Sequence, residues 1–203
     1  MTPSPQLKLT YWEKPARANI ARLILHFGNV PFEDEHIGEG STELFAIKPS
    51  LPLGQIPALE VDGVVYAQSI AIARYASRMT GLYPIDITEA LFVDMITDTF
   101  IELNGPLYGA CFCRDAATKR EKIDDFLATS LPKYFAMLEK TVRGKFFLGE
   151  KLSLADFLLF DAVAYLIRPN MPVFDLSTYP KLEAIVSEVK ALPTLQEYLS
   201  KTL

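Results

Sequence analysis

The sequence predicts a small α/β domain followed by an all-helical domain. Three observations support this. Strand-like and helix-like segments alternate through residues 7–79 in the order β-α-β-α-β-β-α. A linker containing glycine and proline follows at about residues 81–88, and only helical patterns come after it. The predicted domains are therefore residues 1–81 and 82–203.

The first domain begins with a strand, a helix and a second strand. Residues 7–12 have strand character. Residues 16–28 place apolar side chains on one helical face and stop at a glycine: Ile20, Leu23, Ile24, Phe27 and Gly28. The alternating segment 31–37 predicts the second strand. A strand–helix–strand unit implies a right-handed crossover between parallel strands.

A hairpin and a helix complete this domain. Residues 41–48 show a weaker helical pattern. The Asp62-Gly63 pair lies between two apolar runs, residues 58–61 and 64–67, and predicts a tight turn because both residues tolerate positive φ angles. The hairpin would add an antiparallel edge to the sheet, and a helix is expected over residues 69–79.

The second domain is predicted to contain helices only, with Thr88 as the cap of the first. The expected helices cover residues 89–104, 115–143, 154–168, 179–192 and 193–201. Gly105-Pro106, Gly144 and Pro169 would separate them. Pro132 would kink or break the second helix.

Composition excludes several classes of protein. The net charge of -5 offers no basic surface, so nucleic acid is not an expected partner. The most apolar stretch, residues 154–167, is too short to span a membrane and contains two aspartates. The N-terminus lacks the apolar core of a signal peptide. The expectation is a soluble cytoplasmic protein.

The cysteines and histidines do not indicate a metal or disulfide site. Cys111 and Cys113 are one residue apart, which is too close for an ordinary disulfide. The chain has 2 histidines, which gives little support to a zinc cluster. No metal is therefore expected to be required.

Two neighbouring features suggest a peptide-binding site. The residue before a proline is pushed towards extended geometry, so Ile56 could pair with a peptide backbone if Pro57 is cis. An ordinary trans proline is the alternative, which sequence physics alone favours because only ~5–6% of X–Pro bonds are cis. Gln68-Ser69 opens a helix, and a helix N-terminus suits a carboxylate. The alternative is that Ser69 only caps its own helix.

These features also carry a family resemblance. The segment QIPALEVDGVVYAQSIAIARY, residues 55–75, strongly resembles the glutathione-binding segment of cytosolic glutathione transferases. LTYW followed by RANIARLIL resembles their opening strand, catalytic tyrosine and first helix, and SLADFLLFD resembles their buried helix-capping segment. The resemblance spans nearly the whole chain and points to the sigma class and related tyrosine-type members.

The resemblance implies a thioredoxin-like first domain, a cis Pro57 and a homodimer that uses glutathione as co-substrate. Tyr11 matches the tyrosine that hydrogen-bonds the glutathione sulfur. A phenolic donor stabilises the thiolate, the nucleophilic form of a thiol whose free pKa is ~8.5. The implied activity is conjugation of this thiolate to hydrophobic electrophiles.

Other site residues follow from the same resemblance. The implied glutathione-binding residues are Tyr11, Trp12, Arg17, Lys48, Gln55, Ile56, Pro57, Gln68 and Ser69. Lys48 would contact the glycine end of the tripeptide, Gln55 and Ile56 its cysteine, and Gln68 with Ser69 the γ-glutamyl carboxylate. Glu102 falls where an acidic residue reaches into the partner subunit's site, and Asp98 is a second candidate for that role.

The chain departs from the family pattern at three positions. Leu44 stands where a tryptophan commonly donates its indole N–H to the glycine carboxylate, and leucine cannot donate. Ala16 replaces a more usual glycine, and Asn19 replaces a usual glutamate. The change at Leu44 would weaken glutathione binding unless another residue compensates.

Alternatives remain open. Tyr108 and Phe112 would line a hydrophobic acceptor pocket, or serve as core or interface aromatics. The glutathione site of a glutathione-dependent isomerase, such as a prostaglandin D synthase, would look the same. A non-enzymatic scaffold of the lens-crystallin kind is the third interpretation, favoured by Leu44 and opposed by the retained site residues.

Overall fold

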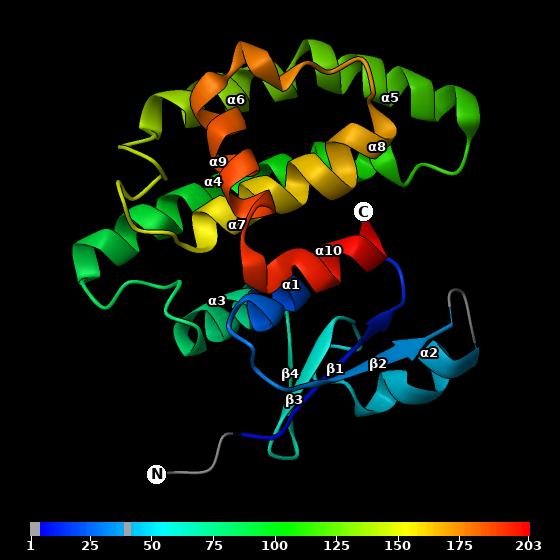
Figure 1. The fold of residues 1–203 in the computed structure, drawn as a ribbon. Helices are drawn as coiled ribbons and strands as arrows, with labels where there is room; N and C mark the ends of the chain where they lie inside the picture. Colours follow the sequence, from blue (N-terminus) through cyan, green and yellow to red (C-terminus); the bar gives the residue numbers. More distant parts are fainter. Residues whose placement is uncertain (1–4, 39–41) are drawn as a thin grey trace. The chain divides into compact units, whose positions relative to one another are not determined.

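In the computed structural model, which describes residues 5–38 and 42–203, the chain divides into two units between Gly81 and Leu82. The first unit contains a sheet and the helices α1, α2 and α3, and the second is built from helices (Figure 1). The predicted fold class is confirmed, including the thioredoxin-like topology of the first unit.

The sheet of the first unit has the strand order β2-β1-β3-β4. Its strands are β1 (Leu7–Trp12), β2 (Glu33–Ile37), β3 (Ala58–Val61) and β4 (Val64–Ala67). β1 runs parallel to β2, with Tyr11 opposite His36, and antiparallel to β3. β3 and β4 form the predicted hairpin, and both turn residues have positive φ angles, 49° at Asp62 and 83° at Gly63. The parallel crossover and the antiparallel edge are therefore both confirmed.

The helices of this unit are α1 (Asn19–Phe27), α2 (Thr42–Ile47) and α3 (Ser69–Met79), and a 3₁₀ turn (Lys48–Ser50) follows α2. α1 packs against α3, and a Cβ at Gly28 would overlap the Thr80 side chain, so a glycine is needed where the two helices end. α1 begins later than expected because Ala16 has a φ of 143°, which is not helical. Ser41, the first residue of the expected second helix, lies outside the described residues.

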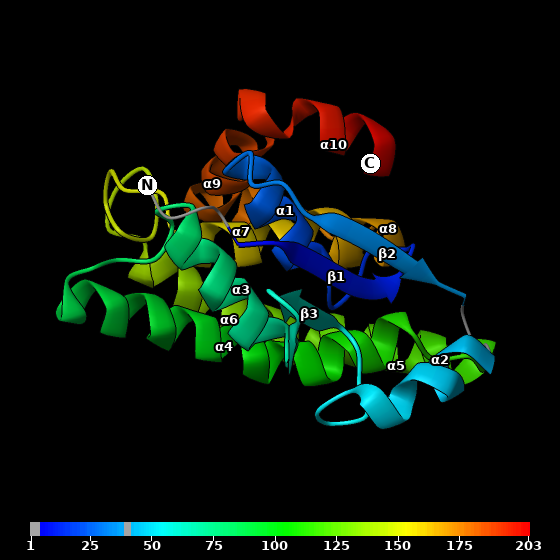
Figure 2. The same cartoon turned by 90° about the horizontal axis from the view of Figure 1, so that it is seen from below.

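The second unit is organised around α4. Its helices are α4 (Ile87–Cys111), α5 (Ala116–Ala128), α6 (Ser130–Thr141), α7 (Leu154–Asp161), α8 (Arg168–Asn170), α9 (Pro180–Lys190) and α10 (Gln196–Thr202). Figure 2 shows the length of α4, which packs against α5, α6 and α7. A π-helical segment, Ala162–Ile167, joins α7 to α8, and 3₁₀ turns lie at Leu176–Thr178 and Pro193–Leu195.

Several predicted helix boundaries are wrong. Asp86, and not Thr88, caps α4, because its carboxylate accepts from the N–H groups of Thr88 and Glu89. α4 continues through Gly105-Pro106 to Cys111, since the buried residues Leu103, Leu107 and Ala110 keep its inner face packed. The predicted helix 115–143 is broken at Thr129, where φ is -121°, and not at Pro132. Pro132 lies in the first turn of α6, where the missing N–H would have had no helical partner.

Neither a membrane span nor a metal cluster is found in the described part of the chain. No helix within residues 5–38 and 42–203 combines the length and apolar character needed to cross a bilayer. The same residues include no group of three or more His, Cys, Asp or Glu side chains placed to hold a metal ion.

Candidate functional site

A pocket of about 410 Å³ lies in the first unit. It is lined by Trp12, Arg17, Leu44, Lys48, Gly54, Gln55, Ile56, Pro57, Gln68 and Ser69. These residues come from the end of β1, the loop after it, α2 and the turn beyond, the segment before β3, and the start of α3. Apart from Tyr11, every residue that the sequence predicted for glutathione binding in this domain lines this one pocket.

One wall of the pocket is the corner at Ile56-Pro57. The peptide bond between them is cis, as the family resemblance implied, and the trans alternative is wrong. β3 begins only at Ala58, so Ile56 precedes the strand ladder. Pro57 is buried and Ile56 is half-buried at the pocket. The backbone at Ile56 therefore stands where an extended ligand could pair with it.

The start of α3 also lines the pocket, through Gln68 and Ser69. Gln68 occupies the N-cap position with a φ of 77°, and its side chain makes no capping hydrogen bond to the helix. Ser69 is the first helical residue and not the N-cap, so the alternative in which Ser69 caps its own helix is wrong. Helix N-termini present unpaired N–H groups and partial positive charge, and this one faces a pocket that also holds Lys48 and Arg17. Such a site favours anionic groups.

Tyr11 is almost completely buried, with 2% of its surface exposed. It is on β1 immediately before Trp12, and the two ring centroids are 5.0 Å apart. The guanidinium carbon of Arg22 lies 5.9 Å from the centroid of the Tyr11 ring. Tyr11 is not among the residues that line the pocket, so its contact with a glutathione sulfur remains a prediction.

Two pocket residues had no predicted binding role. Gly54 has a φ of 60°, and a Cβ there would lie 3.3 Å from Cε of Lys48, so glycine keeps that lysine's surroundings open. In the sequence, Gly54 stands directly before the QIPAL segment, and that position could have indicated that it belongs to the pocket. Leu44 also lines the pocket, so an apolar side chain takes the place where a family tryptophan would donate a hydrogen bond.

The remaining predicted site residues belong to the second unit. Glu102 is exposed on α4, and its Oε2 accepts a hydrogen bond from the Tyr134 hydroxyl at 3.3 Å. Asp98 is exposed one turn earlier. Tyr108 and Phe112 stack on each other with ring centroids 5.4 Å apart. Their predicted roles towards a partner subunit and an acceptor remain predictions.

The cysteines at the end of α4 are free thiols, as the sequence predicted. Cys111 is buried, and its Sγ lies 3.6 Å from the Leu166 carbonyl oxygen. Burial raises the pKa of the Cys111 thiol to about 11, although the charge of Lys119 lowers it. A buried thiol with a raised pKa has little thiolate character at neutral pH, which fits the packing role predicted for Cys111.

Family models match both parts of the chain. The model for the glutathione S-transferase N-terminal domain matches residues 7–78, and the model for the C-terminal domain matches residues 101–202. These matches cover most of both structural units.

Individual known proteins are similar to this chain over almost its full length. A hematopoietic prostaglandin D synthase from Gallus gallus is 32% identical over 198 residues, covering 97% of this chain and 96% of that protein. Glutathione S-transferase 3 from Caenorhabditis elegans is 33% identical over 203 residues, covering 96% and 95%. The solved structure of a Fasciola hepatica sigma class GST matches with a TM-score of 0.85 and 27% identity, covering 98% of this chain and 97% of that one. Together with the family models, these similarities establish that the chain belongs to the glutathione S-transferase family and is a sigma-like glutathione-conjugating enzyme.

Proposed function

We propose that the pocket in the first unit binds glutathione along the path from Lys48 to Ser69, and that Tyr11 activates the thiol. The N-terminus of α3 holds the γ-glutamyl carboxylate, the Ile56 backbone pairs with the cysteine residue, and Lys48 attracts the glycine carboxylate. The Tyr11 hydroxyl donates a hydrogen bond to the sulfur and stabilises the thiolate. The thiolate then attacks an electrophilic carbon, forming a C–S bond as the electrophile accepts the electron pair or expels its leaving group.

One observation carries the proposal. The cis corner at Ile56-Pro57 and the helix start at Gln68-Ser69 line the same pocket, joined by the β3–β4 hairpin. A backbone pairing edge and an anion-binding helix start are the two groups needed to hold a peptide with a free carboxylate. The cationic side chain of Lys48 supplies a second anion contact.

The test compares glutathione with cysteinylglycine, the same thiol without its γ-glutamyl group. Glutathione is expected to bind at least about 10-fold more tightly, because a hydrogen bond to a charged group contributes about 1.5–3 kcal/mol. Titrations followed by the fluorescence of Trp12, which lines the pocket, would measure both dissociation constants. Equal affinities would contradict the assignment of the α3 N-terminus to the γ-glutamyl carboxylate.

The acceptor is proposed to be a hydrophobic electrophile, with Tyr108 and Phe112 as candidate lining residues. Isomerisation of a prostaglandin-like substrate is the second candidate, because one relative is a hematopoietic prostaglandin D synthase at 32% identity. The two reactions differ in their products: conjugation consumes glutathione, whereas isomerisation regenerates it. Measuring glutathione consumption against product formation separates them.

We also propose that the enzyme is a homodimer joined in part through α4. Ile87, Leu91 and Met95 are apolar and exposed, at 83%, 69% and 47%, and their spacing of four places them on one helical face. Asp98 and Glu102 continue the same face. An exposed apolar face of this kind, continued by two carboxylates, fits a dimer interface, here called the α4 seam. At this interface Glu102 of one subunit would contact the glutathione site of the other.

Leu91→Glu is expected to weaken this dimer by at least about 30-fold, because a buried interface anchor contributes about 2 kcal/mol or more. Sedimentation velocity over a range of protein concentrations measures the change. Met137→Glu is the matched control, since Met137 is also exposed, at 50%, but lies on α6. A monomeric wild type, or equal dissociation of both variants, would rule out the α4 seam and the partner role of Glu102.

A further inference from the structure

Arg22 is a charged side chain that the fold buries almost completely. It lies on α1 and is 2% exposed. A buried charge is costly unless it is paired and fully hydrogen-bonded. The hydrogen-bond partners of Arg22 therefore indicate which parts of the fold this side chain holds together.

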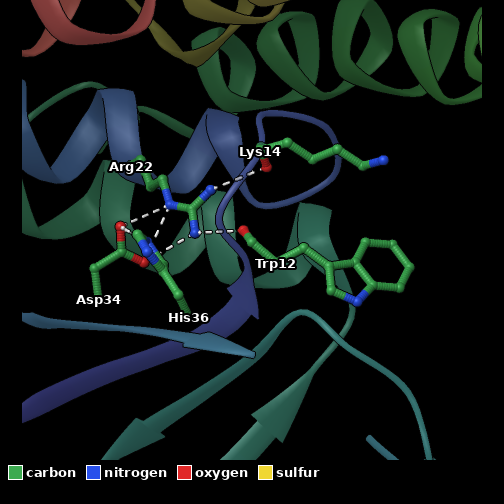
Figure 3. Close-up of polar contacts among 5 residues, drawn as sticks. All are labelled: Trp12, Lys14, Arg22, Asp34 and His36. Carbon is green, nitrogen blue, oxygen red and sulfur yellow. Dashed lines mark hydrogen bonds and ion pairs between the residues drawn. The ribbon is translucent and has the colours of Figure 1, made fainter. Parts of the chain in front are cut away.

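The first partner is Asp34 on β2. Nε of Arg22 donates to both carboxylate oxygens of Asp34, at 3.1 and 2.8 Å, and Nη2 donates to Oδ1 at 3.0 Å. The second carboxylate oxygen also lies 3.1 Å from Nε2 of His36. Figure 3 shows the guanidinium fixed by this carboxylate on one side. The pair neutralises the buried charge and anchors Arg22 to the sheet.

The other side of the guanidinium binds backbone. Nη2 donates to the carbonyl oxygen of Trp12 at 3.0 Å, and Nη1 donates to that of Lys14 at 3.4 Å (Figure 3). Both carbonyls belong to the stretch that begins where β1 ends, and Arg17 follows it. Trp12 and Arg17 both line the pocket. Arg22 thus connects α1 and β2 to the segment that forms one wall of the pocket.

This segment needs external support. Ala16 has a φ of 143°, a backbone conformation that suits glycine and is strained for any residue with a Cβ. Such strain persists only where the surrounding structure enforces it. The indole nitrogen of Trp12 is buried and has no hydrogen-bond partner among the residues described, so no such bond orients that ring. Two kinds of contact do restrain the segment: Arg22 donates to the carbonyl oxygens of Trp12 and Lys14, and the Asn19 N–H donates to the Ala16 carbonyl oxygen at 3.0 Å.

We propose that Arg22 is a positioning residue of the glutathione pocket. It holds the strained segment between Trp12 and Arg17 in the conformation that places both side chains in the pocket wall. Arg22 is not among the residues that line the pocket, and it acts through the carbonyl oxygens of Trp12 and Lys14. The inference rests on the proposed glutathione site and adds a residue outside the pocket that controls its shape.

Arg22→Lys tests the proposal because lysine keeps the charge opposite Asp34 but lacks the planar fork that reaches two carbonyls. The Kd for glutathione is expected to rise by about 10- to 100-fold, the cost of misplacing binding groups by a small distance. The chain has 1 tryptophan, so fluorescence reports on Trp12 directly. Its emission maximum and its quenching by acrylamide are expected to change in the same variant.

A second substitution separates positioning from general stability. Adding Ala16→Gly to Arg22→Lys is expected to recover much of the lost affinity, because glycine adopts the required φ without strain. The two single variants and the double variant complete a double-mutant cycle. Leu25→Ala is the control: Leu25 is fully buried on the same helix, so this change lowers stability and leaves Trp12 emission and glutathione affinity unchanged.

The outcomes distinguish the two proposals. A wild type that does not bind glutathione would overturn the proposed function. A wild type that binds, with an Arg22→Lys variant of equal affinity and unchanged fluorescence, would overturn only the positioning role. If Arg22→Lys does not fold, Asp34→Asn removes the anchoring charge, and the same losses of affinity and emission are expected. An Asp34→Asn enzyme unchanged in both would equally contradict the inference.

Discussion

Replacing Tyr11 with phenylalanine is expected to lower the rate of glutathione conjugation by about 10²-fold or more. The substitution removes one hydroxyl and keeps the ring that packs 5.0 Å from Trp12. Tyr11 is 2% exposed, and a hydrogen bond in such a water-poor environment stabilises a thiolate more strongly than one in solvent. Losing the donor should therefore raise the pKa of the glutathione thiol and reduce the fraction of bound thiolate at neutral pH.

Two measurements check this expectation. The ultraviolet absorbance of the bound thiolate, followed against pH, should shift to higher pH in Tyr11→Phe, and kcat at neutral pH should fall with it. The Kd for glutathione should change little, because the pocket lining is untouched. Tyr66→Phe is the control, since Tyr66 is 53% exposed on β4. A Tyr11→Phe enzyme with the wild-type thiolate titration and kcat would show that another group activates the thiol.

Asp156→Ala is expected to destabilise the folded chain by about 3–5 kcal/mol, a large part of the stability of an ordinary protein. Asp156 is fully buried in the first turn of α7. Its Oδ1 accepts from the Phe147 backbone N–H at 2.9 Å, and its Oδ2 accepts from the N–H and hydroxyl of Ser153 at 2.8 and 2.9 Å. Burial raises the pKa of Asp156 to about 6, although these hydrogen bonds lower it. Alanine would leave three buried donors without acceptors.

Urea unfolding followed by circular dichroism measures the loss. Asp175→Ala is the matched control, because Asp175 also caps a helical turn by accepting from the backbone N–H and hydroxyl of Ser177, at 2.9 and 2.7 Å. Asp175 is exposed, so water replaces its hydrogen bonds and the loss should be far smaller. Equal losses in the two variants would contradict the argument from burial.

Local patterns in the sequence account for most of the fold. The apolar face of α1 and the Asp62-Gly63 turn depend on residues close together in the chain, and both were predicted. The end of α4 was not, because a proline breaks a helix only when packing does not compensate for the lost hydrogen bond. Leu107 and Ala110 are buried beyond Pro106, and that contact depends on the tertiary structure.

The pocket was predictable for a different reason. Its corner and its helix start lie within residues 55–69, and they carry the family resemblance. Arg22 was not predicted, because an arginine on a helix ordinarily faces solvent and nothing in the sequence links it to Asp34 or to the Trp12 carbonyl. The strained backbone at Ala16 was not predicted either, because the φ angle of a residue cannot be read from its type. The one indication in the sequence was that Ala16 stands where the family more usually has glycine.

All residues that line the pocket fall between Trp12 and Ser69, within the first unit. Within one chain, substitutions in residues 82–203 therefore change none of these lining residues, whereas a change at Glu102 or Asp98 would alter the contact proposed from the partner subunit. Recognition of the shared co-substrate and the rest of the protein can diverge at different rates within one gene. A change of acceptor could therefore arise in the helical unit while the residues that line the glutathione pocket stay the same.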